Sequence, residues 1–274
     1  MIIVQEKGKR FSALHDGPDT FVIANAHDVG SARILAALGF PALATSSAAF
    51  ANTLGRADYH ITRTEKLAHC RALAEATDLP VSADLENCFA HDPEGVAETI
   101  GLAGGTGLVG GSVEDTTGDK ARPIYDFAHA VERVAAAAEA ARKLPFRFTL
   151  TARAENFLHG RRDIDDTIRR LQAFEKAGAD VLYACGVTEM ADIRAMVGAL
   201  SKPVNVMAAK SLSVGELATA GVRRVSIAAW FGRAALGGLI AAAREVKERG
   251  TFGFIEGLPS GAEIATLLEK GKPT

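Results

Sequence analysis

The sequence predicts an α/β protein built as a closed (β/α)8 barrel, a TIM barrel, and three observations lead to this prediction. The chain has 274 residues, which suits a single unit of this kind. Short β-rich runs occur eight times at an average spacing of about 29 residues, enough for a strand, a helix and two connections. Polar side chains collect at the downstream ends of several runs, whereas the alternative, an open doubly wound sheet, would concentrate them near one switch point.

The eight runs are interpreted as strands because apolar residues fill both faces until the last few positions. This pattern is typical of a parallel sheet that helices cover on the outside. The expected strands span residues 21–28, 42–47, 80–86, 108–115, 148–155, 181–186, 203–209 and 224–229.

The segments between the strands carry helix start and stop signals. Thr62 with Glu65, and Ser213 with Glu216, have the spacing of a capping box, in which two side chains satisfy free backbone N–H groups at a helix start. Helix ends are expected at three glycines, which tolerate the left-handed conformation common there: Gly39, Gly178 and Gly221.

Two segments lie outside the eight repeats. Residues 1–20 are expected to include a short helix that covers the bottom of the barrel. Near the other end, Ile264, Leu267 and Leu268 share one face of a predicted helix. We therefore expect a barrel domain over residues 1–250 and a helical extension over residues 251–274, which needs an apolar surface to cover, its own or that of a neighbouring subunit.

Composition narrows the classes of partner and location. The chain has 31 basic and 33 acidic residues and no basic run, which argues against binding of nucleic acid. No apolar stretch approaches the roughly 18 residues that a membrane span needs, and the first residues lack the pattern of a signal peptide, so a cytoplasmic location is expected. Without a C-x-x-C pair, the cysteines are interpreted as free thiols: Cys70, Cys88 and Cys185.

Acidic residues at the ends of the third and fourth expected strands form the main candidate site. Asp84 and Glu86 alternate with Leu85, so on a regular strand both carboxylates face the same side. Like charges this close call for a divalent cation, and oxygen ligands without a histidine pair favour Mg²⁺ or Mn²⁺ over Zn²⁺. Glu114 and Asp115 end the next strand and add oxygens; alternatively such acids cap helices or pair with arginines, which suits Asp115.

Candidate anion-binding groups come from other strand ends. Arg153, near the end of the fifth expected strand, has a planar fork of donors that can hold a carboxylate or phosphonate at two points. The alternative for Arg153 is an internal salt bridge with Glu155 or Glu114. Hydroxyl, amide and backbone donors to an anion are expected from Ser46, Ser47 and Asn205.

In chain order, these motifs resemble the isocitrate lyase/phosphoenolpyruvate mutase superfamily. The resemblance extends over roughly residues 20–245 and rests on Ser46-Ser47, Leu54-Gly55 with Asp58, Asp84-x-Glu86, Glu114-Asp115, Ala152-Arg153-x-Glu155 and Pro203-Val204-Asn205. It implies a (β/α)8 barrel whose C-terminal helix is often exchanged between subunits, and hence a homodimer or homotetramer.

The resemblance also implies roles for individual residues. Three positions would hold Mg²⁺, partly through water: Asp84, Glu86 and Glu114. The expected catalytic residues are Asp58, in a mobile loop near the site, and Arg153, which would grip the acidic end of the substrate. The segment whose N–H groups would hold the 2-oxo carboxylate consists of Ser46, Ser47 and Ala48.

Two departures from the superfamily pattern bear on the reaction. The loop at residues 115–122 lacks the Cys and His of the lyase members' Lys-Lys-Cys-Gly-His loop, and also the asparagine of the mutase members' Lys-Thr-Asn-Ser-Leu stretch. The glycine-rich turn usual after the third strand is replaced by Glu86-Asn87-Cys88-Phe89-Ala90. These differences argue against isocitrate or methylisocitrate cleavage, and they weaken the ligand role of Glu86 relative to that of Asp84.

The sequence-based hypothesis is therefore a Mg²⁺-dependent lyase that acts on a small anionic 2-oxo acid through an enolate. Decarboxylation of oxaloacetate fits best, because it needs charge stabilisation and no strong general acid. Arg153 would then anchor the distal carboxylate. One alternative is phosphorus–carbon bond chemistry of the phosphoenolpyruvate mutase or phosphonopyruvate type; another is a barrel that binds a ligand without turnover.

Overall fold

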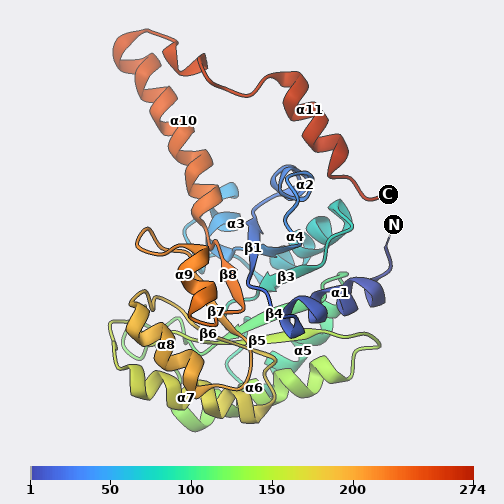
Figure 1. The fold of residues 1–274 in the computed structure, drawn as a ribbon, viewed down its shortest axis with the longest axis vertical. Helices are drawn as coiled ribbons and strands as arrows, with labels where there is room; N and C mark the ends of the chain where they lie inside the picture. The colour runs from blue at the N-terminus through green and yellow to red at the C-terminus, as the bar shows by residue number, and fades with distance from the viewer. Residues whose placement is uncertain (1) are drawn as a thin grey trace.

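The computed structural model describes residues 2–274, and in it the eight expected strands close into one parallel barrel in chain order (Figure 1). Each strand pairs with the next, and the eighth returns to the first through Val22 opposite Val225. The strands are β1 (Phe21–Ala26), β2 (Ala42–Thr45), β3 (Val81–Asp84), β4 (Gly110–Glu114), β5 (Thr149–Ala154), β6 (Val181–Ala184), β7 (Val204–Met207) and β8 (Arg224–Ser226). The barrel prediction is confirmed.

Helices alternate with the strands and cover the barrel. The expected caps form: the Thr62 and Ser213 side chains accept hydrogen bonds from the amides of Glu65 and Glu216, and Gly178 ends its helix in the left-handed conformation. The helices are α1 (Val4–Asp16), α2 (Val29–Ala37), α3 (Ser47–Thr53), α4 (Arg63–Ala76), α5 (Pro93–Gly104), α6 (Phe127–Arg142), α7 (Ile164–Ala177), α8 (Met190–Ala199), α9 (Val214–Thr219), α10 (Trp230–Arg249), the 3-10 turn η1 (Gly253–Ile255) and α11 (Gly261–Lys270).

The third strand is shorter than predicted, and this changes the direction of one acid. Strand β3 ends at Asp84, and the chain then turns, with Glu86, Cys88 and Phe89 at positive φ. The Cys88 amide closes this turn on the Leu85 carbonyl. Because regular alternation stops at Asp84, the expectation that Asp84 and Glu86 face the same side is wrong.

Helix α1 covers the N-terminal end of the barrel, as expected for residues 1–20. Phe11 is fully buried against Phe21 and Ile23, and the ring of His15 stands edge-on to both phenylalanines. The contact is tight, because a Cβ at Gly8 would lie 2.5 Å from the Arg147 carbonyl oxygen. The floor of the barrel is therefore sealed by the first helix of the chain.

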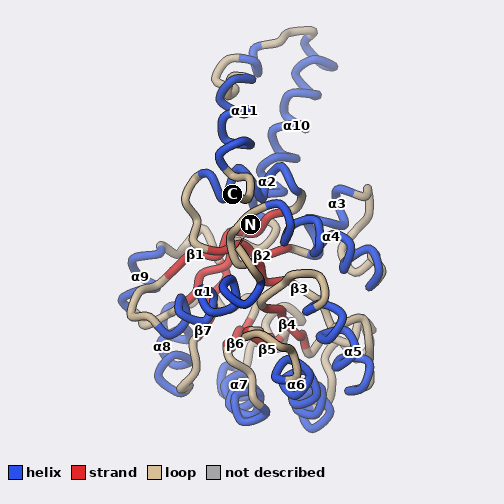
Figure 2. The backbone as a smooth tube through the Cα atoms, turned by 90° about the vertical axis from the view of Figure 1, so that its right-hand side faces the viewer, coloured by secondary structure: helices blue, strands red, loops and turns tan. Residues whose placement is uncertain are grey.

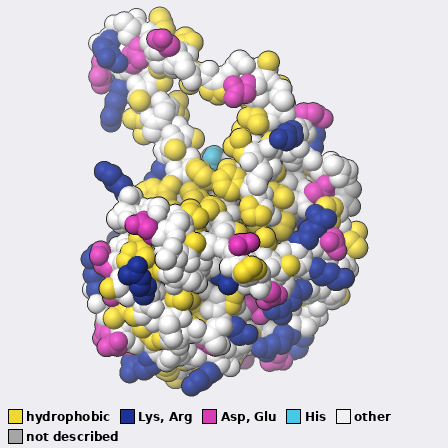
Figure 3. All heavy atoms as spheres, viewed as in Figure 1, with side chains coloured by type: hydrophobic (Ala, Val, Ile, Leu, Met, Phe, Trp, Pro, Cys, Tyr) yellow, Lys and Arg dark blue, Asp and Glu magenta, His cyan; other side chains and the backbone are white. Residues whose placement is uncertain are grey.

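Helices α10 and α11 form an arm that stands away from the barrel (Figures 1 and 2). Helix α11 confirms the predicted C-terminal helix and returns to α2 of the same chain, where Gly271 packs against the Arg33 carbonyl. Hydrophobic side chains gather around the base of the arm, and an opening lies between its two sides, α10 and α11 (Figures 1 and 3). None of the helices within residues 2–274 has both the length and the apolar character that a bilayer crossing requires.

His69, on the buried face of α4, makes stability depend on pH. Its ring stacks on Phe50, with 3.9 Å between centroids, and Nε2 donates to the His27 carbonyl. Burial, reinforced by the Lys66 charge, lowers the pKa of His69 to about 3. The folded state then binds fewer protons than the unfolded state, whose pKa is about 6.5, so stability falls as pH decreases from about 6.5 toward 3.

We expect a His69→Gln variant, which keeps a donor for the His27 carbonyl, to lose less stability than the native protein over this pH range. Urea unfolding at pH 7 and pH 4.5 measures the difference for both proteins. The same decrease in the free energy of unfolding for both would contradict this assignment.

Candidate active site

A cavity of about 290 Å³ opens at the C-terminal end of the barrel, where active sites of this fold form. All eight strands contribute residues to its lining. The loop between α3 and α4 and the start of α10 complete its rim. The cavity includes most of the predicted site: Ser46, Ser47, Ala48, Asp58, Asp84, Glu114, Arg153 and Asn205.

The Asp84 carboxylate is held in place by backbone and side-chain donors. The amide and hydroxyl of Ser47 both donate to Oδ2, each at 3.0 Å, and the Glu86 amide donates to Oδ1 at 3.2 Å. Ser46 begins α3 as its N-cap, accepting from the Ala49 amide. The predicted Ser46-Ser47 segment therefore lies directly beside the predicted metal site.

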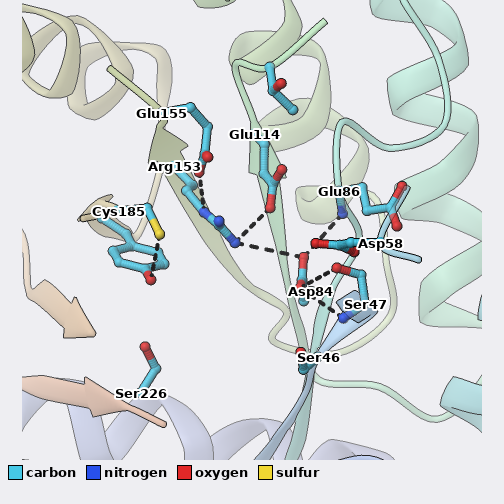
Figure 4. A network of polar contacts seen from close by, with 12 residues as sticks. Ser46, Ser47, Asp58, Asp84, Glu86, Glu114, Arg153, Glu155, Cys185 and Ser226 are labelled. Atoms are coloured by element: carbon cyan, nitrogen blue, oxygen red, sulfur yellow. Dashed lines mark hydrogen bonds and ion pairs between the residues drawn. The ribbon is translucent and has the colours of Figure 1, made fainter. Parts of the chain in front are cut away.

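Arg153 lies between the acids of neighbouring strands (Figure 4). Its Nη1 is 2.6 Å from Glu114 Oε1 and 4.0 Å from Asp84 Oδ1, and its Nε contacts Glu155. The internal salt bridges that were the alternative for Arg153 are thus present. Asp84 and Glu114 approach the same nitrogen atom, so these two predicted ligands do converge.

The loop between α3 and α4 lies over the acids. Tyr59, at φ 60°, donates its hydroxyl to Glu114 Oε2 at 2.9 Å, and its amide donates to Asp58 Oδ1. Asp58 lies next to Asp84 (Figure 4). The family resemblance implies that Asp58 lies near the site, whereas Tyr59 was not predicted, because a tyrosine in a loop carries no distinctive spacing.

Lys66 is a second cation near the acids, and it was not among the predicted site residues. It projects from α4, is fully buried, and donates from Nζ to Thr45 Oγ1 at 2.9 Å. The same hydroxyl accepts from the Asp84 amide at 3.0 Å. In the sequence Lys66 is one lysine among the first residues of a predicted helix, with no sign that it is buried behind the site.

Immediately around Asp84 the acids outnumber the cations, and this affects the protonation of each acid. Although burial acts to raise it, the charges of Arg153 and Lys66 hold the pKa of Asp84 below its usual value. Burial and the Asp84 charge raise the pKa of Asp58, and the same causes raise that of Glu86 to about 8. Such a shared excess of negative charge is what a divalent cation relieves.

The donor set fits a hydrated Mg²⁺ or Mn²⁺ with few direct protein ligands. Within residues 2–274, no three His, Cys, Asp or Glu side chains are grouped closely enough to hold an ion together. Figure 4 shows the Glu86 carboxylate pointing away from Asp84, beyond Asp58, and its buried Oε1 has no hydrogen-bond partner. Mg²⁺ usually keeps several waters, so oxygen donors at this spacing suit it better than Zn²⁺.

The wall opposite the acids is formed by β6 and β7. The Tyr183 hydroxyl lies 3.1 Å from Cys185 Sγ, and the Arg153 guanidinium lies 5.2 Å from the centre of the Tyr183 ring. Burial raises the pKa of Cys185 to about 12, so it remains a thiol. Asn205, predicted to contact an anion, donates to Ser226 and accepts from Arg224 in this structure.

Asp115, although adjacent to Glu114, has the structural role that was its alternative. It accepts from the Glu155 amide at 2.8 Å and pairs with the buried Arg170 at 3.3 Å. Its side chain is absent from the cavity lining.

Comparisons with known proteins agree with this architecture. A family model described as phosphoenolpyruvate phosphomutase matches residues 11–247. A proposed lyase/mutase from Burkholderia cenocepacia J2315 is 51% identical, with a TM-score of 0.94 over 96% of this chain and 95% of that one. A proposed phosphonomutase from the same organism is 34% identical, with a TM-score of 0.83 over 88% and 99%. The oxaloacetate decarboxylase of Bradyrhizobium diazoefficiens is 28% identical over 73% of this chain and 70% of its own.

Proposed function

Because the chain belongs to the phosphoenolpyruvate phosphomutase family, we propose that it is a divalent-metal-dependent lyase acting on a small anionic 2-oxo acid, with oxaloacetate decarboxylation as the preferred reaction. The main support is the approach of Asp84 and Glu114 to the same nitrogen of Arg153, at a place where the surrounding acids outnumber the nearby cations Arg153 and Lys66. The similarity to an oxaloacetate decarboxylase is consistent with this choice.

Asp84 and Glu114 would hold Mg²⁺ or Mn²⁺, and Glu86 would contribute through water. When bound, the ion supplies an electrophile that stabilises negative charge on the 2-oxo oxygen. Ser46, Ser47 and Ala48, at the start of α3, would orient the carboxylate next to the 2-oxo group. Asp58 and Tyr59 would close the loop over the substrate.

Decarboxylation requires little further chemistry from the chain. The bond between C3 and C4 of oxaloacetate breaks, its electron pair moves toward the 2-oxo group, and CO₂ leaves. C3 then takes a proton from water, and the product is pyruvate. No strong general acid is needed, which agrees with the absence of Cys and His from residues 115–122.

Product analysis by NMR tests the proposal. We expect pyruvate release from oxaloacetate in the presence of Mg²⁺, at a rate well above the metal-catalysed background, and loss of this release in EDTA. Turnover of phosphonopyruvate seen by ³¹P NMR, without pyruvate release from oxaloacetate, would instead favour phosphorus–carbon chemistry, which the similarity to a proposed phosphonomutase keeps as the second candidate. Binding of oxalate with Mg²⁺, but no turnover, would favour a non-catalytic barrel.

We also propose that the arm pairs with a second copy of the chain, as a homodimer or homotetramer with exchanged C-terminal helices. Leu239 on α10 is 65% exposed, its neighbour Ile240 is also exposed, and so are Phe252 and Ile255 in the connection that follows α10. Exposed apolar surface of this kind is typical of an interface.

The double variant Leu239→Asp, Ile240→Asp is expected to be monomeric in light-scattering measurements, and Lys247→Glu on the same helix is the control. A monomeric native protein at micromolar concentration would contradict the proposal.

A further inference from the structure

The interior of the barrel contains a buried arginine without an acidic partner. Arg224 begins β8 and is 5% exposed. Its Nε donates to Asn205 Oδ1 at 2.8 Å, its Nη2 to Thr151 Oγ1 at 2.9 Å, and its Nη1 to His15 Nε2 at 3.3 Å. Within residues 2–274, no carboxylate forms an ion pair with Arg224.

His15 is neutral and therefore does not compensate the charge. Its Nδ1 lies 2.8 Å from the Phe11 carbonyl oxygen, so Nδ1 carries the proton and Nε2 accepts from Arg224. Burial, together with the Arg224 charge, lowers the pKa of His15 to about 3. Burial lowers the pKa of Arg224 to about 10, which leaves the guanidinium charged at neutral pH.

Arg224 lies beneath the candidate metal site, in the same cavity. Its partner Thr151 is two positions before Arg153 on β5, so it faces the same side about 7 Å lower. The equivalent positions below Asp84 and Glu114 also carry small polar residues, Ser82 and Ser112. Barrel interiors are usually filled by bulky branched side chains, so these small residues leave a polar space above Arg224.

The other two arginines that line the cavity differ from Arg224 in pairing or in exposure. Arg153 is already paired with Glu114 and Glu155, whereas Arg233 is exposed at the rim beside Trp230. An unpaired buried cation is costly to a fold unless something compensates it. Among the described residues, three of the five N–H groups of Arg224 have hydrogen-bond partners, and all three acceptors are neutral. A ligand oxyanion would provide the missing negative charge.

We propose that Arg224 and Thr151 form a second anion subsite at the floor of the cavity, which binds the oxyanion at the far end of a 2-oxo acid. This inference rests on the proposed function and names its substrate class: dianionic 2-oxo acids with a carboxylate or phosphonate at the far end. The sequence-based hypothesis placed the far carboxylate on Arg153, whereas this inference places it on Arg224. A carboxylate that leaves as CO₂ must give up its charge, so Arg224 stabilises bound substrate more than the transition state.

Calorimetric binding with Mg²⁺ tests the subsite through three probes. Oxalate has no far group, 3,3-difluorooxaloacetate has a far carboxylate, and phosphonopyruvate has a far phosphonate. In Arg224→Met we expect affinity for 3,3-difluorooxaloacetate to fall by roughly 10- to 100-fold and affinity for oxalate to change by less than about threefold. A parallel loss for phosphonopyruvate shows that the subsite accepts either oxyanion. The Michaelis constant for oxaloacetate should rise, and kcat should not fall, because the lost contact stabilised bound substrate more than the transition state.

Arg233→Met is the matched control, because it removes a second cation from the same cavity. Equal losses for oxalate and 3,3-difluorooxaloacetate in Arg224→Met, or a selective loss in Arg233→Met alone, would overturn the subsite. So would a lower Tm of Arg224→Met with unchanged discrimination, which would make Arg224 a structural residue. Failure of the native protein to bind oxalate at all would count against the proposed function and the subsite with it.

A crystal structure of the native protein with Mg²⁺ and 3,3-difluorooxaloacetate gives a readout that does not depend on the folding of any variant. The far carboxylate within hydrogen-bond distance of Arg224 supports the subsite. Its placement on Arg153 or Arg233 overturns it.

Discussion

Asp84→Asn is expected to abolish metal-dependent turnover, by roughly 10³-fold or more, while the barrel remains folded. The asparagine side chain introduced by this substitution keeps an oxygen for the two Ser47 donors but loses the charge that attracts the ion. Removing one negative charge from a group of closely spaced carboxylates should not reduce core packing. The measurement is pyruvate release against Mg²⁺ concentration, together with Tm.

Asp115→Asn provides the contrast, because Asp115 follows β4 directly beside Glu114 but faces the buried Arg170. This variant should lower Tm, since Arg170 loses a buried counter-charge, and should keep the dependence on Mg²⁺. An unchanged metal dependence in Asp84→Asn would remove Asp84 from the metal site.

Arg153→Lys is expected to weaken substrate binding by roughly 1–3 kcal/mol, although the far oxyanion is assigned to Arg224. An ammonium cannot pair with Glu114 and Glu155 and still offer donors to the 2-oxo end of the substrate, as the planar guanidinium can. Arg153→Met should be more severe. It leaves two buried carboxylates without their cation, and breaking such a buried pair costs roughly 3–5 kcal/mol of stability.

Michaelis constants and urea unfolding separate the two effects. Arg147→Lys is the control, since Arg147 forms an ion pair with Asp180 on the surface and should change neither quantity. An unaltered Michaelis constant in Arg153→Lys would show that Arg153 only holds the acids in place.

The fold could be predicted because its signals are local and repeated. Apolar runs and helix caps depend on neighbouring residues, so all eight strands and the capped helices at Thr62 and Ser213 form where expected. The family match confirms the resemblance that the strand-end motifs indicated. The end of β3 was misjudged because Glu86, Cys88 and Phe89 take positive φ without being glycine, which no residue preference predicts.

The site could be predicted only where side chains leave the ends of strands. Asp84, Glu114 and Arg153 converge because the closed sheet brings neighbouring strand ends together. Tyr59 and Lys66 enter from a loop and a helix, and their directions depend on packing between elements that are distant in the sequence. Asn205 was expected to contact an anion, yet its amide oxygen holds Arg224, a residue whose inward position depends on the register of β8.

Helix α1 connects the N-terminal segment to the interior of the barrel, because the His15 imidazole accepts a hydrogen bond from the Arg224 guanidinium. A truncation that removed residues 2–16 would leave all eight strands in the chain, yet it would uncover the underside of that guanidinium. Bulk water would then enter the cavity from the N-terminal end of the barrel, opposite the end at which the cavity opens.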